Sequence, residues 1–391
     1  MSCLLAILAG AIAIAVAVFV IEILAAIILP RRSFDTALEY RGRIAVLVPA
    51  HNESAGLRPT LADIRSQLRP GDRVLVVADN CSDDTAEVAS AAGAEVIERH
   101  DRDHIGKGYA LAFGIAHLRS APPDVVVMID ADCRLSDLEI GKLASACSIT
   151  QRPIQALYLM VAPPGREINH QVAEFAWRIK NWVRPLGLST LGLPCQLMGT
   201  GMAFPWHVIR SAHLAEGWIV EDLKLGLDLA LAGAPALFCP SACVTSEFPS
   251  SATAANTQRQ RWEQGQLTMM LAVPRLILTA IAQRNWSLLA LALDLTVPPL
   301  ALLVILVTSM LAVSAFATLV GASTPLALFI SLTSFLALFF SLFVSWFAYG
   351  REALPIGATF LAIMYVVRKL RFYRHILSGK AVSKWIRTSR E

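Results

Sequence analysis

The chain has 391 residues, of which 55% are hydrophobic and only 16% are charged. Because a soluble domain is typically about a quarter charged, this composition excludes a wholly soluble protein and predicts segments in lipid. The net charge of +4 is too small to indicate a nucleic-acid-binding protein. The seven cysteines are odd in number and lack CxxC spacing, which argues against a zinc site and a disulfide framework.

The N-terminal segment, 1–32, is predicted to be a transmembrane anchor. Residues 3–30 are apolar apart from Glu22 and, at about 1.5 Å per residue, are long enough to cross a bilayer. Arg31 and Arg32 follow at once, which by the positive-inside tendency places the next residues in the cytosol. Glu22 has three interpretations: it is neutral, it pairs within a helix bundle, or it reaches water at the interface.

Residues 40–270 are predicted to form one cytosolic α/β domain. Three short β-branched runs alternate with three helical patterns: strands at 43–48, 73–78 and 125–129, and helices at 57–68, 84–92 and 106–119. Continuous apolar strands that alternate with helices predict a mostly parallel sheet with helices on both faces. In such sheets ligands bind beyond the carboxyl ends of the strands. The chain lacks GxGxxG after the first strand and a GxxxxGK[ST] loop, which disfavours dinucleotide binding and ATP hydrolysis.

Acidic side chains follow the third predicted strand. Asp130 and Asp132 are separated by one small residue, so in an extended backbone both carboxylates would point to one side. Two carboxylates beside a diphosphate suit Mg²⁺ or Mn²⁺, with phosphate oxygens and water as the remaining ligands. The alternative is an ordinary turn at a strand end, where Asp is common.

Polar residues at two other positions extend this candidate site. Asp79 ends the second strand and is placed to accept a hydrogen bond from a base or ribose. Lys107 opens the next helix, where it could meet a phosphate, although an exposed loop lysine would look the same.

Two later patterns complete the set of candidate residues. Glu221 and Asp222 precede an apolar helix, where helix-start carboxylates are common in any case. Gln258, Arg261 and Trp262 share one helix face by their spacing. They could hold a diphosphate and stack a sugar, or belong to an interfacial helix.

The C-terminal region is predicted to return to the membrane. We expect interfacial helices at 271–299, because Asp294, Pro298 and Pro299 interrupt an apolar run, and two crossings within 300–349, at about 300–320 and 324–348. The last segment, 350–391, begins with an apolar stretch and ends in a basic tail suited to an anionic membrane surface.

Taken in order, these motifs resemble glycosyltransferase family 2. PAHNE, DNCSDDT, GKGYAL, DAD, ED and QRQRW follow one another over about 43–270, and Trp385-x-Arg387-Thr388 is similar to the tail of the bacterial exopolysaccharide branch. The QxxRW pattern is shared with polysaccharide synthases and ceramide glucosyltransferase. The resemblance implies a GT-A nucleotide-sugar domain and inversion at the anomeric carbon.

The resemblance also assigns roles to residues. Asp222 would be the general base; Glu53, Asp79, Lys107 and Asp130 would bind the nucleotide sugar; Asp130 and Asp132 would hold the metal; and Glu221, Gln258, Arg261, Trp262 and the loop Gly199, Thr200 and Gly201 would face acceptor and diphosphate. The family's second aspartate after the second strand is Asn80 here.

The function expected from this pattern is transfer of a hexose or N-acetylhexosamine, from a UDP-sugar in the first place, to a lipid-linked acceptor at the cytosolic face of a membrane, the bacterial inner membrane being the expected location. The first alternative is a processive β-polysaccharide synthase with a glycan acceptor, its channel completed by oligomers or polysaccharide-assembly partners. A non-catalytic nucleotide-sugar sensor or secretion subunit is the alternative from another class.

Overall fold

The computed structural model describes residues 2–30, 41–162, 168–215, 217–249 and 251–377. The chain divides into two compact units. Of the described residues, the helical unit comprises 2–30, 162, 168–192 and 251–377, and the sheet unit comprises 41–161, 193–215 and 217–249. Arg31, Arg32 and the tail motif that begins at Trp385 lie outside the described residues.

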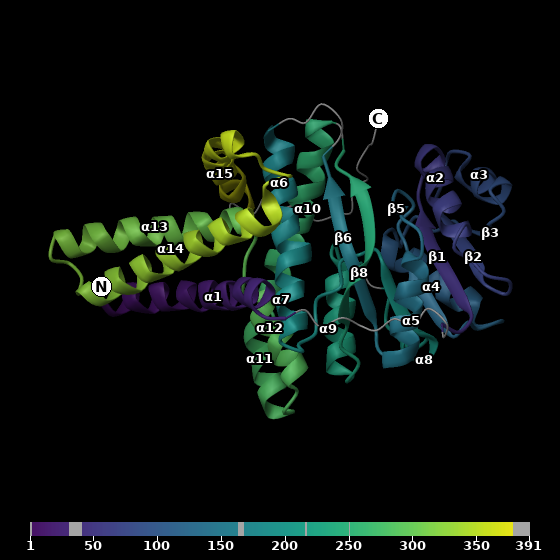
Figure 1. Ribbon diagram of the computed structural model, residues 1–391, viewed down its shortest axis with the longest axis horizontal. Coiled ribbons are helices and arrows are strands. Elements are labelled where there is room, and N and C mark those ends of the chain that lie inside the picture. Colours follow the sequence, from purple (N-terminus) through teal and green to yellow (C-terminus); the bar gives the residue numbers. More distant parts are fainter. Residues whose placement is uncertain (1, 31–40, 163–167, 216, 250, 378–391) are drawn as a thin grey trace. The chain divides into compact units, whose positions relative to one another are not determined.

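The sheet unit is built on eight strands in the order β3-β2-β1-β4-β7-β6-β8-β5 (Figure 1). The strands are β1 (Ile44–Ala50), β2 (Arg73–Asp79), β3 (Glu95–Arg99), β4 (Val125–Met128), β5 (Arg134–Leu135), β6 (Ile154–Val161), β7 (Met202–Pro205) and β8 (Leu237–Glu247). The helices are α2 (Ser54–Arg65), α3 (Thr85–Ala91), α4 (Lys107–Leu118), α5 (Glu139–Thr150), α8 (Trp206–Ile209) and α9 (Glu221–Leu231).

The first half of the sheet is parallel, as the alternating pattern predicts. β1 pairs in parallel with β2 and with β4, and β2 pairs in parallel with β3. The three predicted strands are therefore confirmed, whereas β3, which has polar residues at both ends of its run, was not predicted. The second half is mixed, because β7 runs antiparallel to both β4 and β6.

Both faces of the parallel strands are buried. On one face Leu47, Leu75 and Met128 form a core with side chains of α4 and α9. The alternate residues, Val46 and Val76 among them, are also fully buried. Since successive residues of a strand point to opposite faces, helices must cover both sides of this sheet, as predicted.

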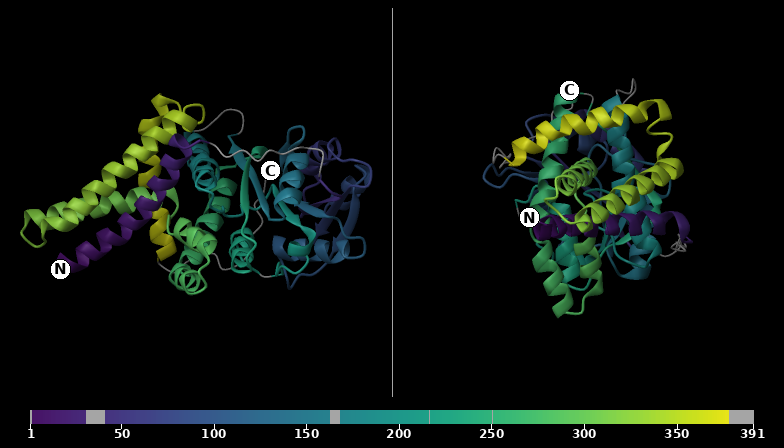
Figure 2. Two further views of the ribbon diagram at one scale, coloured as in Figure 1. Left: turned by 60° about the horizontal axis from the view of Figure 1, so that its bottom comes forward. Right: turned by 90° about the vertical axis from the view of Figure 1, so that its left-hand side faces the viewer.

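The helical unit holds the apolar segments. Its helices are α1 (Ser2–Ile28), α6 (Ile168–Arg178), η1 (Ile179–Val183, a π-helical turn), α7 (Arg184–Thr190), α10 (Ala252–Met270), α11 (Val273–Ala282), α12 (Trp286–Leu295), α13 (Leu300–Leu319), α14 (Pro325–Ser345), η2 (Trp346–Gly350, a second π-helical turn) and α15 (Ile356–Leu377). Helix α14 lies along both α1 and α13 (Figure 2).

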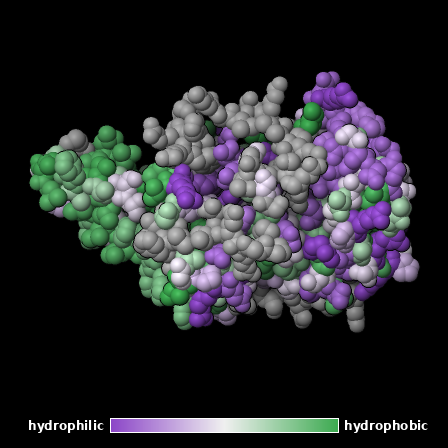
Figure 3. Space-filling view, turned by 90° about the horizontal axis from the view of Figure 1, so that it is seen from above, coloured by the Kyte–Doolittle hydropathy of each residue, from purple (hydrophilic) through white to green (hydrophobic). Residues whose placement is uncertain are grey.

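Three of these helices could cross a membrane. In the described residues, Ser2–Ile28, Leu300–Leu319 and Pro325–Gly350 are long and apolar enough, and the bent pair α10–α11 would make a fourth span if it counted as one. Figure 3 shows hydrophobic side chains gathered over the part formed by α13 and α14. Large exposed side chains there include Phe316, Phe329 and Phe340. A face of this kind suits lipid rather than water.

Glu22 pairs within the helix bundle, the second of its three interpretations. Its Oε2 accepts a hydrogen bond from Nε of Arg184 at 2.5 Å, and Arg184 Nη2 lies 2.6 Å from Oδ1 of Asp294. All three side chains are at least 89% buried. The guanidinium therefore joins α1, α7 and α12, and Asp294, which interrupts an apolar run in the sequence, is one of its two partners.

Candidate active site

Five predicted site residues come together at the carboxyl edge of the sheet unit. Lys107 begins α4, Asp130 follows β4, Gly199 precedes β7, and Glu221 and Asp222 begin α9. The connections that carry them all leave the sheet near the carboxyl ends of β1 and β4, where open α/β sheets bind ligands. The sequence spacing alone places these residues on separate segments; the fold brings them to one place.

Lys107 is the central cation of this cluster. Its Nζ lies 2.5 Å from Asp130 Oδ1 and 4.0 Å from Glu221 Oε1, and it donates to the carbonyl of Gly199 at 2.7 Å. Burial alone would lower the pKa of Lys107, but the charges of Asp130 and Glu221 outweigh it and raise that pKa above its usual value. The lysine is therefore charged throughout the physiological range, as a phosphate-binding cation must be.

Glu221 and Asp222 have different surroundings although they are neighbours. Burial, and then the adjacent charge of Asp222, raise the pKa of Glu221 to about 7. Asp222 Oδ1 accepts a hydrogen bond from the backbone N–H of Leu223 at 2.8 Å in the first turn of α9. Bonds of this kind favour the ionised carboxylate. The pair thus offers Glu221, whose raised pKa lets it hold a proton near neutrality, and Asp222, whose carboxylate is bonded to the first turn of α9.

Buried hydrogen bonds to Asp130 and Gln155 fix the loop Gly199–Gly201. Thr200 is fully buried; its hydroxyl accepts from the backbone N–H of Asp130 at 3.0 Å, and its carbonyl accepts from Gln155 Nε2 at 2.9 Å. Gln155 also accepts from the N–H of Met198 at 2.8 Å. This buried glutamine, on β6, carried no sequence signal that pointed to the site.

The two aspartates of the DAD motif lie in a turn and not on a strand. β4 ends at Met128, and the backbone N–H of Cys133 donates to the carbonyl of Asp130 at 3.2 Å. The prediction that an extended backbone directs both carboxylates to one side is therefore wrong, and the turn interpretation holds for the backbone. The buried Thr60 hydroxyl of α2 supports the turn, since it lies 2.8 Å from the carbonyl of Ala131 and 2.7 Å from that of Cys133.

A divalent cation fits this turn only if a bound substrate supplies further oxygen atoms to it. Among the residues that the structure describes, no group of three or more His, Cys, Asp or Glu could hold a metal ion. Burial raises the pKa of the Cys133 thiol to about 12, so in this structure the cysteine is a protonated thiol at neutral pH. Asp130 and Asp132 are hard oxygen donors, and Mg²⁺ commonly binds one or two carboxylates together with substrate phosphates.

Asp79 ends β2 in a network that the sequence did not reveal. Its Oδ1 lies 2.7 Å from Nη1 of Arg99, at the end of β3, and 3.1 Å from the amide nitrogen of Asn80. Glu53, at the start of α2, donates its backbone N–H to the Thr85 hydroxyl at 2.9 Å. Arg99 escaped prediction because β3 itself did.

The QxxRW residues belong to the helical unit. Gln258, Arg261 and Trp262 lie on α10, and the Trp262 ring packs against Trp177 of α6 with ring centroids 4.9 Å apart. Gln258 is buried, and its side-chain oxygen has no hydrogen-bond partner within the described residues. The shared helix face is therefore real, and its role in acceptor or diphosphate binding stays a prediction.

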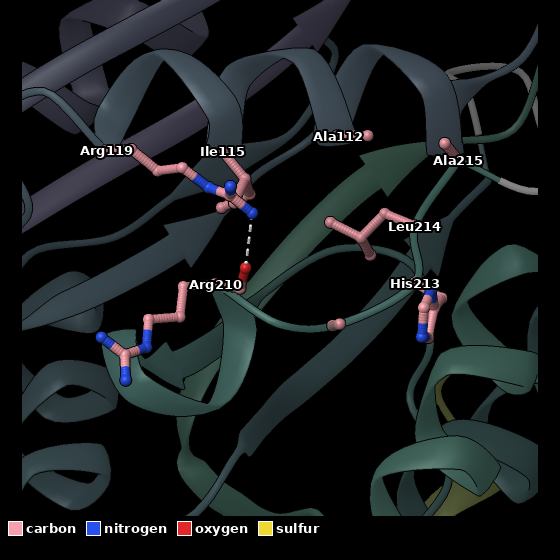
Figure 4. A pocket seen from close by; sticks show the side chains of 8 residues that line it. Ala112, Ile115, Arg119, Arg210, His213, Leu214 and Ala215 are labelled. Atoms are coloured by element: carbon pink, nitrogen blue, oxygen red, sulfur yellow. Dashed lines mark hydrogen bonds between the residues drawn. The ribbon is translucent and has the colours of Figure 1, made fainter.

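A cavity of about 300 Å³ lies at the other end of α4, and it is not part of this cluster. Arg119, Arg210 and His213 line it, over Ile115 and Leu214 (Figure 4). Arg119 donates to the carbonyl of Arg210 at 2.9 Å, and the Arg210 side chain points away from it. The positive charges do not converge on one point, so the cavity is not built around an anion.

Replacement of Gly199 by Ala should lower activity. Gly199 has φ +90°, and a Cβ there would lie 3.2 Å from Asp222 Oδ2 and 3.6 Å from Lys107 Nζ. We expect kcat to fall about 10- to 100-fold, because displacement of reacting groups by an ångström has effects of this size. The matched control is Gly71→Ala, since Gly71 has φ +94° with no atom within 4 Å of the added Cβ. An equal fall in kcat in both variants would show that backbone strain, and not the contact with Asp222 and Lys107, causes the loss.

Replacement of Glu221 by Gln should change how stability depends on pH. The folded state raises the Glu221 pKa from 4.5 to about 7, so it binds the proton more tightly than the unfolded state does. Stability is then fully present below pH 4.5 and is lost as pH rises through 7, by up to about 3 kcal/mol. Because 20% of the side chain is exposed, solvent screening makes the expected loss smaller. Melting temperatures at pH 5 and pH 8 should show the variant gaining on the parent at pH 8; a constant difference would contradict this.

Comparison with known proteins agrees with the geometry of this unit. The sequence model of glycosyltransferase-like family 2 matches residues 41–265, more than half of the chain. The probable glycosyltransferase YdaM of Bacillus subtilis is 26% identical over 254 residues, which are 59% of this chain and 56% of that protein. An uncharacterized glycosyltransferase of Mycobacterium tuberculosis is 34% identical over 189 residues, 43% of this chain and 82% of that protein.

A solved structure supports the fold. The mannosyltransferase PcManGT from Pyrobaculum calidifontis, in complex with GDP-Man and Mn²⁺, superposes with a TM-score of 0.53 at 17% identity, covering 87% of this chain and 97% of that one. This likeness concerns the GT-A-like architecture alone. The chain spans only about half of YdaM, the first of these relatives. The family match and the arrangement of the cluster agree, and the chain belongs to glycosyltransferase-like family 2.

Proposed function

We propose that this glycosyltransferase transfers a hexose or N-acetylhexosamine, with inversion, from a nucleoside-diphosphate sugar to a lipid-linked acceptor. One observation carries the proposal: a charged lysine, two adjacent carboxylates and a glycine-bounded loop meet at the carboxyl edge of the sheet. A displacement at the anomeric carbon needs a base for the incoming hydroxyl and positive charge for the departing diphosphate, and this cluster supplies both kinds of group.

Asp222 is the base in this proposal. Its carboxylate is anchored by the Leu223 N–H at the start of α9, and its Oδ2 lies beside Gly199, where a side chain would obstruct an approaching acceptor. A single displacement needs no covalent nucleophile. The carboxylate takes the proton of the acceptor hydroxyl as the new glycosidic bond forms and the bond to the diphosphate breaks.

Lys107 and the DAD turn bind the leaving diphosphate in this proposal. Asp130 and Asp132 would hold Mg²⁺ or Mn²⁺ together with diphosphate oxygens, and the ion supplies neutralisation of the charge that develops on them. The solved mannosyltransferase with the same fold holds GDP-Man and Mn²⁺, which supports a nucleotide-sugar donor and a divalent ion here. Lys107 orients Asp130 and carries a fixed positive charge.

A lipid-linked acceptor is supported by the helical unit. Three described helices are long and apolar enough to cross a bilayer, so an enzyme anchored in this way works at a membrane surface. A processive synthase passes its polymer through a channel built of many helices. The small number of candidate spans favours transfer of one sugar to a lipid.

The test uses the detergent-solubilised full chain with Mn²⁺, a panel of UDP- and GDP-sugars, and a membrane lipid extract. A single glycolipid product supports the proposal and names the sugar. A ladder of polymer overturns the choice of acceptor and makes the protein a synthase. Metal-dependent nucleotide binding without turnover on any donor and acceptor would favour the non-catalytic sensor.

Removal of the divalent ion should abolish transfer. The described residues offer no third protein ligand beside the two carboxylates, and such a pair binds an ion weakly alone, so EDTA should strip it and reduce turnover at least about 100-fold. Readdition of Mn²⁺ or Mg²⁺ should restore the rate. Isothermal titration should show that the ion binds at least tenfold more tightly when UDP is present. Turnover unchanged in EDTA would contradict a metal-assisted departure of the diphosphate.

A further inference from the structure

We propose that Arg99 and Asn80 make the donor site selective for a uracil base over guanine, because they occupy one oxygen of Asp79. This inference rests on the proposed function, in which Asp79 meets the nucleotide. It adds two residues that select the base. The three residues lie at the ends of the adjacent strands β2 and β3.

Only one oxygen of the Asp79 carboxylate, Oδ1, accepts hydrogen bonds from the protein. Oδ1 accepts from Arg99 Nη1 at 2.7 Å and from Asn80 Nδ2 at 3.1 Å, so both of its lone pairs are occupied. Oδ2 has no hydrogen-bond partner in the described residues. It is not one of the fully buried atoms without a partner there, so it is open to solvent. Asp79 therefore presents a single free acceptor oxygen to a ligand.

Arg99 cannot easily turn away from Asp79. Its Nη2 lies 2.9 Å from Asp101 Oδ2 and donates to the carbonyl of His104 at 2.9 Å, and its guanidinium lies 5.5 Å from the centre of the Tyr109 ring. Its side chain is only 10% exposed. These contacts fix the guanidinium from three directions, so its bond to Oδ1 persists when a nucleotide arrives.

Asn80 does what an aspartate at this position could not. Its amide nitrogen donates to Oδ1 of Asp79 and to the carbonyl of Asp101 at 3.0 Å, while its amide oxygen accepts from the Asp101 N–H at 2.8 Å. A carboxylate lacks the donor that two of these bonds need. Asn80 also has φ +53°, a left-handed conformation that asparagine tolerates well. The asparagine that replaces the family's aspartate therefore helps Arg99 to hold Oδ1 of Asp79.

One free oxygen distinguishes the bases. Uracil offers a single N–H between two carbonyls, which one acceptor satisfies. Guanine offers adjacent N1–H and N2–H donors, which need both oxygens of a carboxylate. A buried donor left without a partner weakens binding, and sites that read hydrogen bonds discriminate strongly for this reason. At about 4.8 Å between strands, Asp79 lies about 10 Å from the end of β4, a distance that a nucleoside diphosphate can bridge to Asp130.

The test is calorimetric titration of the full chain in detergent with Mn²⁺ and UDP or GDP. We expect UDP to bind at least tenfold more tightly than GDP. Arg99→Met frees one of the two lone pairs of Oδ1, while Asn80 still holds the other, and should reduce the UDP-to-GDP affinity ratio at least fivefold. Arg99→Lys, which keeps a donor, should retain part of that ratio. Arg73→Met is the matched control, because Arg73 joins β2 to β3 through Glu95 at the opposite ends of the same strands.

The outcomes separate this inference from the function. Equal affinity of the parent chain for UDP and GDP, with sugar transfer intact, overturns the proposed role of Arg99 and Asn80 in base selection. The proposed function is then unaffected. Equal weakening of both nucleotides in Arg99→Met, with the ratio unchanged, also overturns it. If Arg99→Met does not fold, Asn80→Gly takes its place, because it removes the second donor to Oδ1 and tolerates the positive φ. An unchanged UDP-to-GDP affinity ratio in Asn80→Gly then overturns the inference. Failure of both nucleotides to bind the parent chain contradicts the proposed function itself.

Discussion

Asp222→Asn should abolish sugar transfer while donor binding survives. Asparagine keeps the size of the side chain, and its oxygen can still accept the Leu223 N–H, but it cannot take a proton at neutral pH. General-base catalysis contributes about 10²- to 10⁴-fold, so we expect kcat to fall by about that factor. The rate of transfer from the preferred donor and the dissociation constant for UDP with Mn²⁺ are the two measurements.

The control for this variant is on the same helix. Asp228 of α9 pairs with Lys224 one turn earlier, and its side chain is 35% exposed. Asp228→Asn should leave kcat within about twofold, because exposed pairs contribute little. If Asp222→Asn retains most of its turnover, Asp222 is not the base. If it loses UDP binding in proportion to turnover, the residue acts in binding and not in proton transfer.

Arg184→Met should destabilise the helical unit more than other single substitutions of charged residues. It leaves the side chains of Glu22 and Asp294 buried at 2.6 Å or less from the position where one guanidinium was bonded to both. Removal of one partner from a buried ion pair costs about 3–5 kcal/mol, because an uncompensated charge remains. Thermal unfolding in detergent and resistance to proteolysis should both report the loss.

Two further variants test this explanation. Arg134→Met removes a guanidinium that pairs with Asp63 at 2.7 Å but is 59% exposed, and should cost less than about 1 kcal/mol. Glu22→Gln and Asp294→Asn, combined with Arg184→Met, remove all three charges and should recover most of the lost stability. If the triple variant is as unstable as Arg184→Met alone, packing and not charge explains the effect.

Local patterns in the sequence were sufficient for the main elements of both units. The β-branched runs that became β1, β2 and β4 are continuous and buried on both faces, so hydrophobicity alone marks them. The long apolar segments that became α1, α13 and α14 are equally unambiguous. By contrast, β3 has the sequence EVIER with polar ends, so its pairing with β2, and not its composition, makes it a strand.

The sequence by itself determined the family, the order of the motifs and the elements that carry them, because each depends on residues close together in the chain. Tertiary structure alone decided which groups meet. Lys107 contacts Asp130 and Gly199 across 23 and 92 positions of sequence, and Arg184 finds Glu22 on a helix 162 residues away. A charge shows in the sequence that it needs a partner, but only the packing of strands and helices determines which partner it has.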